Sequence, residues 1–468
     1  MFIVLFLFPF FAGVLLFFIR SKVINNTTLI CYSLLYLIIT LIQVFKPEEF
    51  SIYFKVDNIS LLFMLTLAVI FLGVSFYNAI FSLQDETTEK AHTYYTIFFL
   101  FFVASMTGAI LSTHIVLLWV FIEATTLSSA YLIYYNKNKS SLEAAWKYIF
   151  ICSIGIALAF TGIVLLSIAT GNGCSLFFDD LYRNATSMNA FWLKIAFIFI
   201  LVGFGTKAGL APVHAWLPDA HSEAPSPVSA MLSGTLLNVA FLGIIRVYRI
   251  MELSNTIGYC QILMLIMGFL SIFVCTVYIS RVKNYKRMLA YSSIENMGVA
   301  LIGISLGGIG FFAALLHIIA HSLTKAAFFL TSGNINMIYA SKSIANVKNL
   351  HQRDKVSSWL WIFSFIGISG IPPFPLFLSE LFIIKAFFIK GLFFLAFIMF
   401  FLLTIIIYGM GNTVLNMCFG ESEKNAEIVQ LNYLLYIPQV IFFTILLVIG
   451  LLLPEEIYNI VQKAASLL

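Results

Sequence analysis

The sequence predicts an all-α polytopic membrane protein. Of its 468 residues, 61% are hydrophobic and only 10% are charged, and the mean hydropathy is +1.00. Apolar stretches of about 20 residues, the length that crosses a hydrocarbon core, recur along the whole chain. A soluble globular domain is excluded by this composition.

The apolar stretches predict roughly fourteen transmembrane helices. The first stretch has no basic segment before it and no small-residue cleavage site after it, so we expect a retained helix rather than a removed signal. The expected helices cover residues 2–19, 28–45, 58–81, 93–111, 115–135, 142–170, 191–220, 226–250, 258–279, 288–306, 309–338, 357–389, 392–418 and 434–453.

Two of these helices are expected to be interrupted, the seventh (191–220) and the twelfth (357–389). Glycine permits unusual backbone angles and proline removes a hydrogen-bond donor. Non-helical backbone is tolerated at membrane depth only where it is buried in protein or lines a wet cavity. The interrupting residues are Gly209, Pro212 and Pro218 in the seventh helix, and Gly370, Pro372, Pro373 and Pro375 in the twelfth.

The spacing of the two interruptions predicts an internal repeat. They lie five helices apart, and a matched pair of broken helices is typical of the ion site in inverted-repeat transporters. We therefore expect two inverted five-helix repeats, formed by the fourth to eighth and the ninth to thirteenth helices. The expected units are 1–90 for the first three helices, 91–251 and 252–419 for the repeats, and 420–468 for the last helix.

The basic residues predict the orientation. Lysine and arginine are about twice as frequent on the odd-numbered connections, Lys424 included, as on the even-numbered ones, and cytoplasmic connections carry this excess. Both termini are therefore expected on the periplasmic side of an inner membrane. Arg246 and Arg249, at the end of the eighth helix, are expected to be interfacial anchors. No dense basic patch suggests nucleic-acid binding.

The cysteines give no sign of a cofactor. None of them forms a CxxC pair or another close cluster, so the spacing of iron–sulfur and zinc sites is missing. We expect neither a cofactor nor a metal, and no active site belonging to this chain. The six cysteines are Cys31, Cys152, Cys174, Cys260, Cys275 and Cys418.

Four charged residues stand inside apolar stretches: Glu123, Lys207, Lys325 and Glu380. An ionised group at the bilayer centre costs about 2.5–3.5 kcal/mol even on generous scales, and such groups usually mark an ion or proton route. Lys207 precedes the first interruption, and Glu123 on the helix over 115–135 is its expected partner. The alternative is a static pair that holds the two helices together.

The helix over 309–338 carries His317, His321 and Lys325 at intervals of four residues, which places them on one face. Imidazole titrates near neutrality and can both accept and donate, as a proton relay requires. The alternatives are haem or metal ligation, although no acidic or thiol ligand stands nearby, and histidines that are merely packed in the bundle.

Further titratable residues are secondary candidates. Asp219 and Glu223 are expected to cap the broken helix ends, because acidic groups favour helix N-termini. Glu295 occupies the place in the second repeat that Glu123 has in the first. Lys147 is either a cytoplasmic uptake residue or a snorkelling lysine. The remaining candidates are His214 and His221 near the first interruption and Lys385 beyond Glu380.

Five strings of the sequence stand out: WVFIEATTLSSAYLI, FGTKAGLAPVHAWLPDAHSEAPSPVSAMLSG, KRMLAYSSIENMG, HIIAHSLTKAAFFLTSG and GIPPFPLFLSEL. They resemble one family, the antiporter-like subunits of respiratory complex I, group 4 membrane-bound hydrogenases and Mrp cation/proton antiporters. Within that family, the strings YSSIENMG and PPFPLFLSEL are most similar to the hydrogenase-4 component F type.

The resemblance implies fourteen helices with inverted repeats and a polar axis along the membrane midplane. It also implies that Glu123, Lys207, Lys325 with its two histidines, and Glu380 handle protons. One position departs from the pattern: many relatives have a lysine where this chain has Asn238. The link between the halves is then expected to run through water, through Asn238 or through His221.

The sequence thus predicts a proton-translocating subunit, without a cofactor, of a redox-driven membrane complex. Its expected partners are other membrane subunits, a peripheral redox module reached through them, the lipid bilayer, and protons or Na⁺. Three alternatives remain: an Mrp-type Na⁺/H⁺ antiporter subunit, a proton-flux subunit of an inorganic-carbon uptake complex, and a structural anchor.

Overall fold

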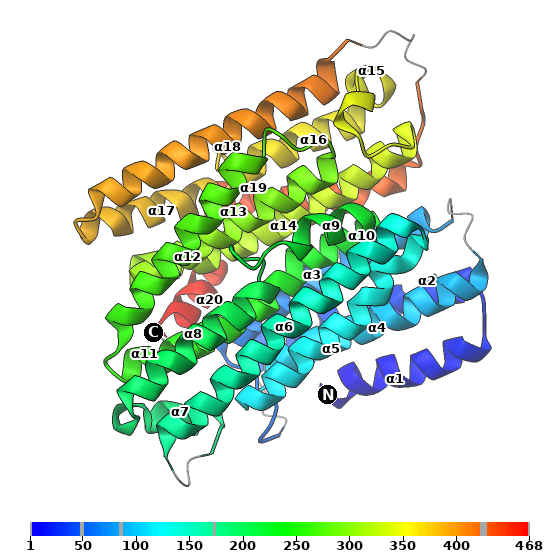
Figure 1. Ribbon diagram of the computed structural model, residues 1–468. Coiled ribbons are helices and arrows are strands. Elements are labelled where there is room, and N and C mark those ends of the chain that lie inside the picture. The colour runs from blue at the N-terminus through cyan, green and yellow to red at the C-terminus, as the bar shows by residue number, and fades with distance from the viewer. Residues whose placement is uncertain (1, 47–50, 84–87, 172–174, 422–427, 467–468) are drawn as a thin grey trace.

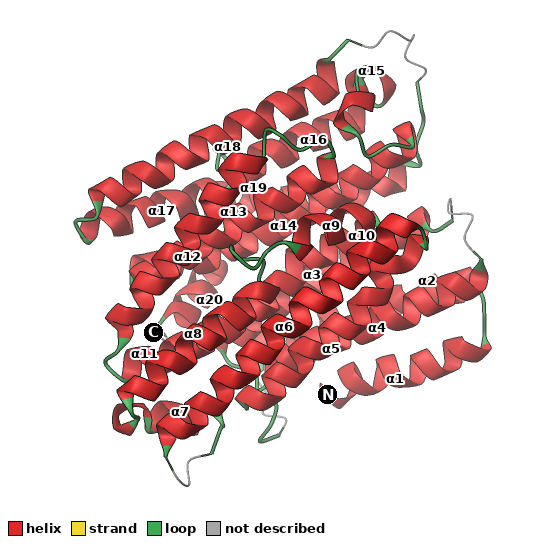
Figure 2. Ribbon diagram, in the orientation of Figure 1, coloured by secondary structure: helices red, strands yellow, loops and turns green. Residues whose placement is uncertain are grey.

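The computed structural model describes residues 2–46, 51–83, 88–171, 175–421 and 428–466. Within these ranges the chain is made of helices and loops, as Figure 2 shows, and extended pairing is limited to three isolated bridges such as Phe54 with Ser112. Cys174 and Lys424 lie outside the described residues.

The helices run side by side through one slab (Figure 1). The first half of the chain contains α1 (Phe2–Phe18), α2 (Lys22–Phe45), α3 (Asn58–Phe81), α4 (Glu89–Leu111), α5 (Ile115–Ile133), α6 (Lys139–Thr170), α7 (Phe178–Arg183), α8 (Ala190–Lys207), α9 (Trp216–Glu223), α10 (Ser226–Met231) and α11 (Leu237–Leu253). One π-helical stretch, Leu232–Leu236, joins α10 to α11.

The second half lies on the other side of the slab. It contains α12 (Ile257–Tyr278), α13 (Tyr285–Leu306), α14 (Ile309–Tyr339), α15 (Leu350–Arg353), α16 (Lys355–Ile368), α17 (Pro375–Ile389), α18 (Phe393–Phe419), α19 (Ile437–Leu452) and α20 (Glu455–Ala465).

The number of candidate membrane spans agrees with the sequence. Twelve helices in the described part of the chain are long and apolar enough to span a bilayer. The shorter α1 and the interrupted pair of α16 and α17 supply the two remaining segments. The all-α polytopic fold is confirmed.

The start of α2 differs from the expected one. The apolar stretch begins at residue 28, but the helix begins at Lys22. Asn25 donates to Thr93 Oγ1 over 3.0 Å and Asn26 donates to Ser82 Oγ over 2.9 Å. Because these amides are satisfied inside the protein, the helix can extend past the point where hydropathy ends.

The order of packing repeats along the chain. In the first half α4 packs on α5, α5 on α6 and α6 on α8; in the second half α12 packs on α13, α13 on α14, and α14 on α16 and α17. The fourth member of each series is the interrupted one. This recurrence fits the two five-helix repeats, while the repeat boundaries stay a prediction.

Both interruptions turn on a glycine in the left-handed backbone region, with φ of 77° at Gly209 and 59° at Gly370. Backbone groups freed at the first break find partners in the protein. Trp216 Nε1 donates to the carbonyl of Thr206 over 2.8 Å, and the Ala211 amide donates to Ser271 Oγ over 2.9 Å. These bonds satisfy groups that would be costly to leave unpaired inside a membrane.

Replacing Gly209 with alanine is expected to destabilise the protein by about 1–2 kcal/mol, because a residue with a Cβ is strained at positive φ. The added carbon would also contact Leu217 Cδ1, which would have to move. Gly258→Ala is the matched control, since Gly258 has open space around it and no positive φ. The test is thermal unfolding of both variants in detergent, and equal melting temperatures would contradict the argument.

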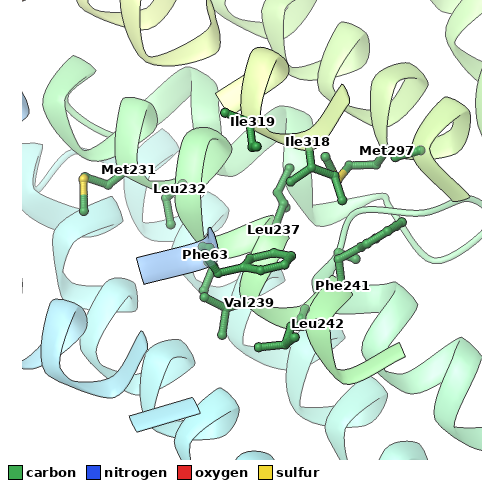
Figure 3. Close-up of a cluster of buried hydrophobic side chains, with 14 of the residues drawn as sticks. Phe63, Met231, Leu232, Leu237, Val239, Phe241, Leu242, Met297, Ile318 and Ile319 are labelled. Atoms are coloured by element: carbon green, nitrogen blue, oxygen red, sulfur yellow. The ribbon is translucent and has the colours of Figure 1, made fainter. Parts of the chain in front are cut away.

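A hydrophobic core fills the boundary between the halves. Figure 3 shows side chains from α3, from the α10–α11 segment, and from α13 and α14 turned toward one another. This core surrounds the π-helical stretch, a feature that is frequent at functional sites. The labelled members are Phe63, Met231, Leu232, Leu237, Val239, Phe241, Leu242, Met297, Ile318 and Ile319.

Candidate functional site

Lys207 is the centre of the first polar cluster. It is the last residue of α8 and none of its surface is exposed. Its Nζ donates to Thr126 Oγ1 over 2.9 Å and to the Tyr148 hydroxyl over 2.5 Å. The ammonium also lies 4.5 Å from the centre of the Tyr148 ring, a favourable position for a cation.

Glu123 reaches Lys207 through one hydroxyl group. Thr126 Oγ1 donates to Glu123 Oε2 over 3.1 Å, and Ser153 Oγ donates to Oε1 over 3.2 Å. Glu123 and Thr126 lie three residues apart on α5, hence on one helix face. Among the residues that the structure describes, Lys207 has no direct ion pair with Glu123, so the expected pair is a bridged one.

The short helix α9 connects the two halves by ion pairs. Asp219 Oδ2 lies 3.1 Å from Lys147 Nζ on α6, and Asp219 Oδ1 lies 2.5 Å from an Arg287 nitrogen on α13. Glu223 Oε2 lies 3.2 Å from Lys342 Nζ. Asp219 lies in the first turn of α9, where an acid is favoured, but α9 has no side-chain cap bond and Glu223 is its last residue. Both carboxylates form ion pairs where capping bonds were expected.

The second cluster lies on α14. His317, His321 and Lys325 are all fully buried, and His317 Nδ1 lies 2.9 Å from Ser379 Oγ, the residue before Glu380. Lys325 Nζ donates to the Leu289 carbonyl over 2.7 Å and also to Ser292 Oγ, both on α13. The three residues therefore face protein and not lipid.

Two carboxyl groups stand beside this cluster. Glu295 on α13 is buried, and Asn296 Nδ2 donates to its Oε2 over 2.7 Å. Glu380 on α17 lines the same small cavity as Glu295. Glu295 lies within electrostatic reach of both Lys325 and Glu380.

Polar contacts cross the boundary between the halves at the π-helical stretch. Asn238 Nδ2 donates to Ser322 Oγ on α14 over 2.6 Å, and Ser233 Oγ lies 2.8 Å from Ser293 Oγ on α13. His221 stacks on Phe329, one turn beyond Lys325, with ring centres 4.9 Å apart. Asn238 and His221 thus both contact α14 of the second half, and their role as a link stays a prediction.

Some candidates lie away from the clusters. Lys385 is exposed on α17, His214 is half-buried in the linker before α9, and Lys147 is 46% exposed. Arg246 is not an interfacial anchor: it is buried and forms an ion pair with Asp57. That expectation failed because its partner lies far away in the sequence.

Several site residues escaped the sequence analysis. Lys286 lies just before the expected helix over 288–306, yet it is buried at the start of α13 and donates to the Ala224 carbonyl over 2.6 Å. Tyr148 carried no signal, because hydroxyl groups are common in membrane helices. The spacing of Thr126 from Glu123 was the one available clue.

Comparison with known proteins shows which family this chain belongs to. The family model described as NADH:quinone oxidoreductase/Mrp antiporter, TM, matches residues 112–451. The hydrogenase-4 component F homolog of Methylacidiphilum infernorum is 33% identical, covering 99% of this chain and 98% of that protein. Hydrogenase-4 component B of Escherichia coli is 29% identical over 73% of this chain, which spans only 52% of that longer protein.

Solved structures share the fold. A chain of the membrane-bound sulfane sulfur reductase, an archaeal respiratory membrane complex, superposes with a TM-score of 0.89 at 26% identity. The superposition covers 99% of this chain and 96% of the reductase chain. A chain of the Mrp complex from Dietzia sp. superposes with a TM-score of 0.86 at 20% identity, with the same two coverages.

Proposed function

Because this chain belongs to the NADH:quinone oxidoreductase/Mrp antiporter family as an antiporter-like membrane subunit, we propose that it moves protons through its buried Glu, Lys and His side chains. It does so inside a multi-subunit membrane complex. The relatives named above are subunits of hydrogenase-4 and of respiratory and Mrp complexes.

The observation that carries the proposal is the burial of two lysines without a carboxylate in direct contact. Neither Lys207 nor Lys325 has an ion pair among the described residues, and both bond only to hydroxyl and carbonyl oxygens. Lysine in such surroundings changes its protonation readily. A group of this kind responds to a charge that arrives nearby.

The coupling is electrostatic. Two unit charges about 6 Å apart, roughly the span of the two hydrogen bonds through Thr126, interact by about 3 kcal/mol at an effective dielectric of about 20. A proton that reaches Glu123 therefore alters Lys207 through the Thr126 bridge, and the second cluster responds in turn through the polar contacts at the π-helical stretch. His317 and His321 provide sites along α14 where a proton can pause.

The assembly follows from the family. We infer that lipid and other membrane subunits cover the exposed apolar faces of α1 and α18, and that a peripheral redox module supplies the driving reaction. Both termini lie on the periplasmic side, since the basic connections face the cytoplasm.

The proposal is tested by proton flux in vesicles that contain the chain in its native membrane complex. An imposed membrane potential should drive acidification at the same rate whether Na⁺ or choline is the external cation. His321→Leu should slow that flux about tenfold, because leucine removes one of the two imidazoles that can accept and donate a proton while His317 remains. The exposed Lys385→Met is the matched control and should leave flux unchanged.

Two outcomes would contradict this reading. Wild-type vesicles with no potential-driven flux would mean that the chain is a structural anchor. Flux that requires Na⁺ and is accompanied by Na⁺ movement in the opposite direction would mean that it exchanges sodium for protons.

A further inference from the structure

A small cavity near the second interruption is framed by two carboxyl groups. Glu295 from α13 and Glu380 from α17 line it together with Ser369, and apolar residues of α16 and α18 close it. The space leaves about 10 Å³ for the centre of a water molecule. This volume admits one water molecule.

Ser369 gives the cavity an unsatisfied polar group. Its side chain is only 6% exposed, and Oγ has no hydrogen-bond partner among the described residues. Buried hydroxyl groups are nearly always bonded to protein or to ordered water. A water molecule in the cavity would meet this hydroxyl and the carboxyl groups and so find the two to four polar partners that it needs.

Glu380 is held against the backbone of the break. Gly370 has a positive φ, and a Cβ at that position would touch Glu380 Oε2. The carboxyl group therefore lies directly over the interruption between α16 and α17. Only a glycine at residue 370 allows this approach.

Glu295 stands between groups of opposite charge. Lys325 and Glu380 are both within its electrostatic reach, and Asn296 holds its Oε2 from within α13. Glu295 is therefore a group through which Lys325 and Glu380 can be linked.

We propose that Glu295 and Glu380 form a carboxyl pair that shares one proton through a water molecule on Ser369, and that Glu295 passes protons between Lys325 and Glu380. Two neighbouring carboxyl groups in an apolar site are not ionised together. At the start the shared proton is on Glu380 and Glu295 is ionised. A proton from the Lys325 ammonium then neutralises Glu295 and leaves a neutral amine, and Glu380 releases its own proton to solvent. The proton on Glu295 moves through the water to the Glu380 carboxylate, and Glu295 becomes ionised again.

This inference rests on the proposed proton transport, and the same vesicles test it. Glu295→Gln keeps the shape of the side chain but cannot carry a proton, so potential-driven flux should fall about tenfold or more. Glu295→Asp should recover part of the flux. Ser305→Ala is the control, because Ser305 is buried on the same helix and bonds only to its own helix at Ile302.

Infrared difference spectra give a second test. If Glu295 had only a structural role, its replacement would not change the carbonyl band of Glu380. In a coupled pair, Glu295→Gln shifts the carbonyl band of protonated Glu380, and Glu380→Gln shifts the band of Glu295. Bands that disappear one at a time without affecting each other would overturn the shared proton.

The flux data separate this inference from the proposed function. If Glu380→Gln abolishes flux while Glu295→Gln leaves it intact, the pair is wrong and proton transport stands. If wild-type flux is absent, proton transport itself fails. Radioactive sodium retained by the wild type and lost in both glutamine variants would make the cavity a sodium site and overturn the proton pair.

Discussion

Replacing Lys207 with methionine is expected to lower potential-driven proton flux at least about 100-fold, the usual loss when a positioned proton-transfer group is removed. Methionine has a similar length and packs adaptably, so the fully buried site should keep its shape. The hydroxyls of Thr126 and Tyr148 remain, but no group is left between them that can bind and release a proton. The measurement is vesicle acidification, with the amount of assembled complex determined in parallel.

A milder variant tests the hydroxyl group that bridges Lys207 and Glu123. Thr126→Val keeps the shape of the side chain and removes the hydroxyl that joins Lys207 to Glu123. A hydrogen bond to a charged group contributes about 1.5–3 kcal/mol, so flux should fall about 10- to 100-fold. Thr161→Val, whose exposed hydroxyl bonds only to Ala157 of its own helix, should have no effect. Unchanged flux in Lys207→Met would remove the first cluster from the proton route.

The sequence located the charged members of the site and missed their polar partners for one reason. A lysine or glutamate inside an apolar stretch stands out because burial is costly, so Glu123, Lys207, Lys325 and Glu380 could be singled out. Hydroxyl groups have no such cost when they bond to their own helix. Nothing in the sequence distinguishes Tyr148 from tyrosines that face lipid.

In the fold, too, some elements could be predicted from the sequence and others could not. Long apolar helices and Gly/Pro interruptions follow from composition, and both broken helices lie where they were expected. The short helices α7, α15 and α20 were not predicted, because each is too short or too polar to register as a span. Their positions depend on tertiary contacts, such as the packing of Tyr458 on Phe312.

Arg246 shows that the sequence does not reveal an ion-pair partner that lies far away along the chain. Its charge near a helix end is typical of an anchor at the membrane interface. In the structure it is 7% exposed and pairs with Asp57, which is 29% exposed and lies almost 200 residues earlier. A second guanidinium nitrogen donates to Ser60 Oγ over 3.0 Å. The pair joins the start of α3 to α11, and so joins the N-terminal helices to the first repeat.

Asp57→Asn is expected to destabilise the protein by about 3 kcal/mol, because it leaves a buried guanidinium without its counter-charge. Asparagine is as good an N-cap as aspartate, so the bond from the Ser60 amide, now 2.8 Å, should survive. The change therefore isolates the ion pair from the cap. Arg183→Ala is the control: its pair with Asp180 is 3.6 Å long and exposed, and should contribute less than about 1 kcal/mol.

The difference between wild type and Asp57→Asn should depend on pH in one direction. Burial by itself would raise the pKa of Asp57, but the Arg246 guanidinium and the hydrogen bonds from Arg246 and Ser60 outweigh it and lower that pKa. A carboxyl group with a lowered pKa stabilises the fold above its unfolded value of about 3.9, and this stabilisation is lost as the pH falls through the folded value. Denaturant titrations in detergent should therefore give the full difference at neutral pH and a smaller one below about pH 4. A difference that stays constant over this range would show that the asparagine acts through packing and not through the lost charge.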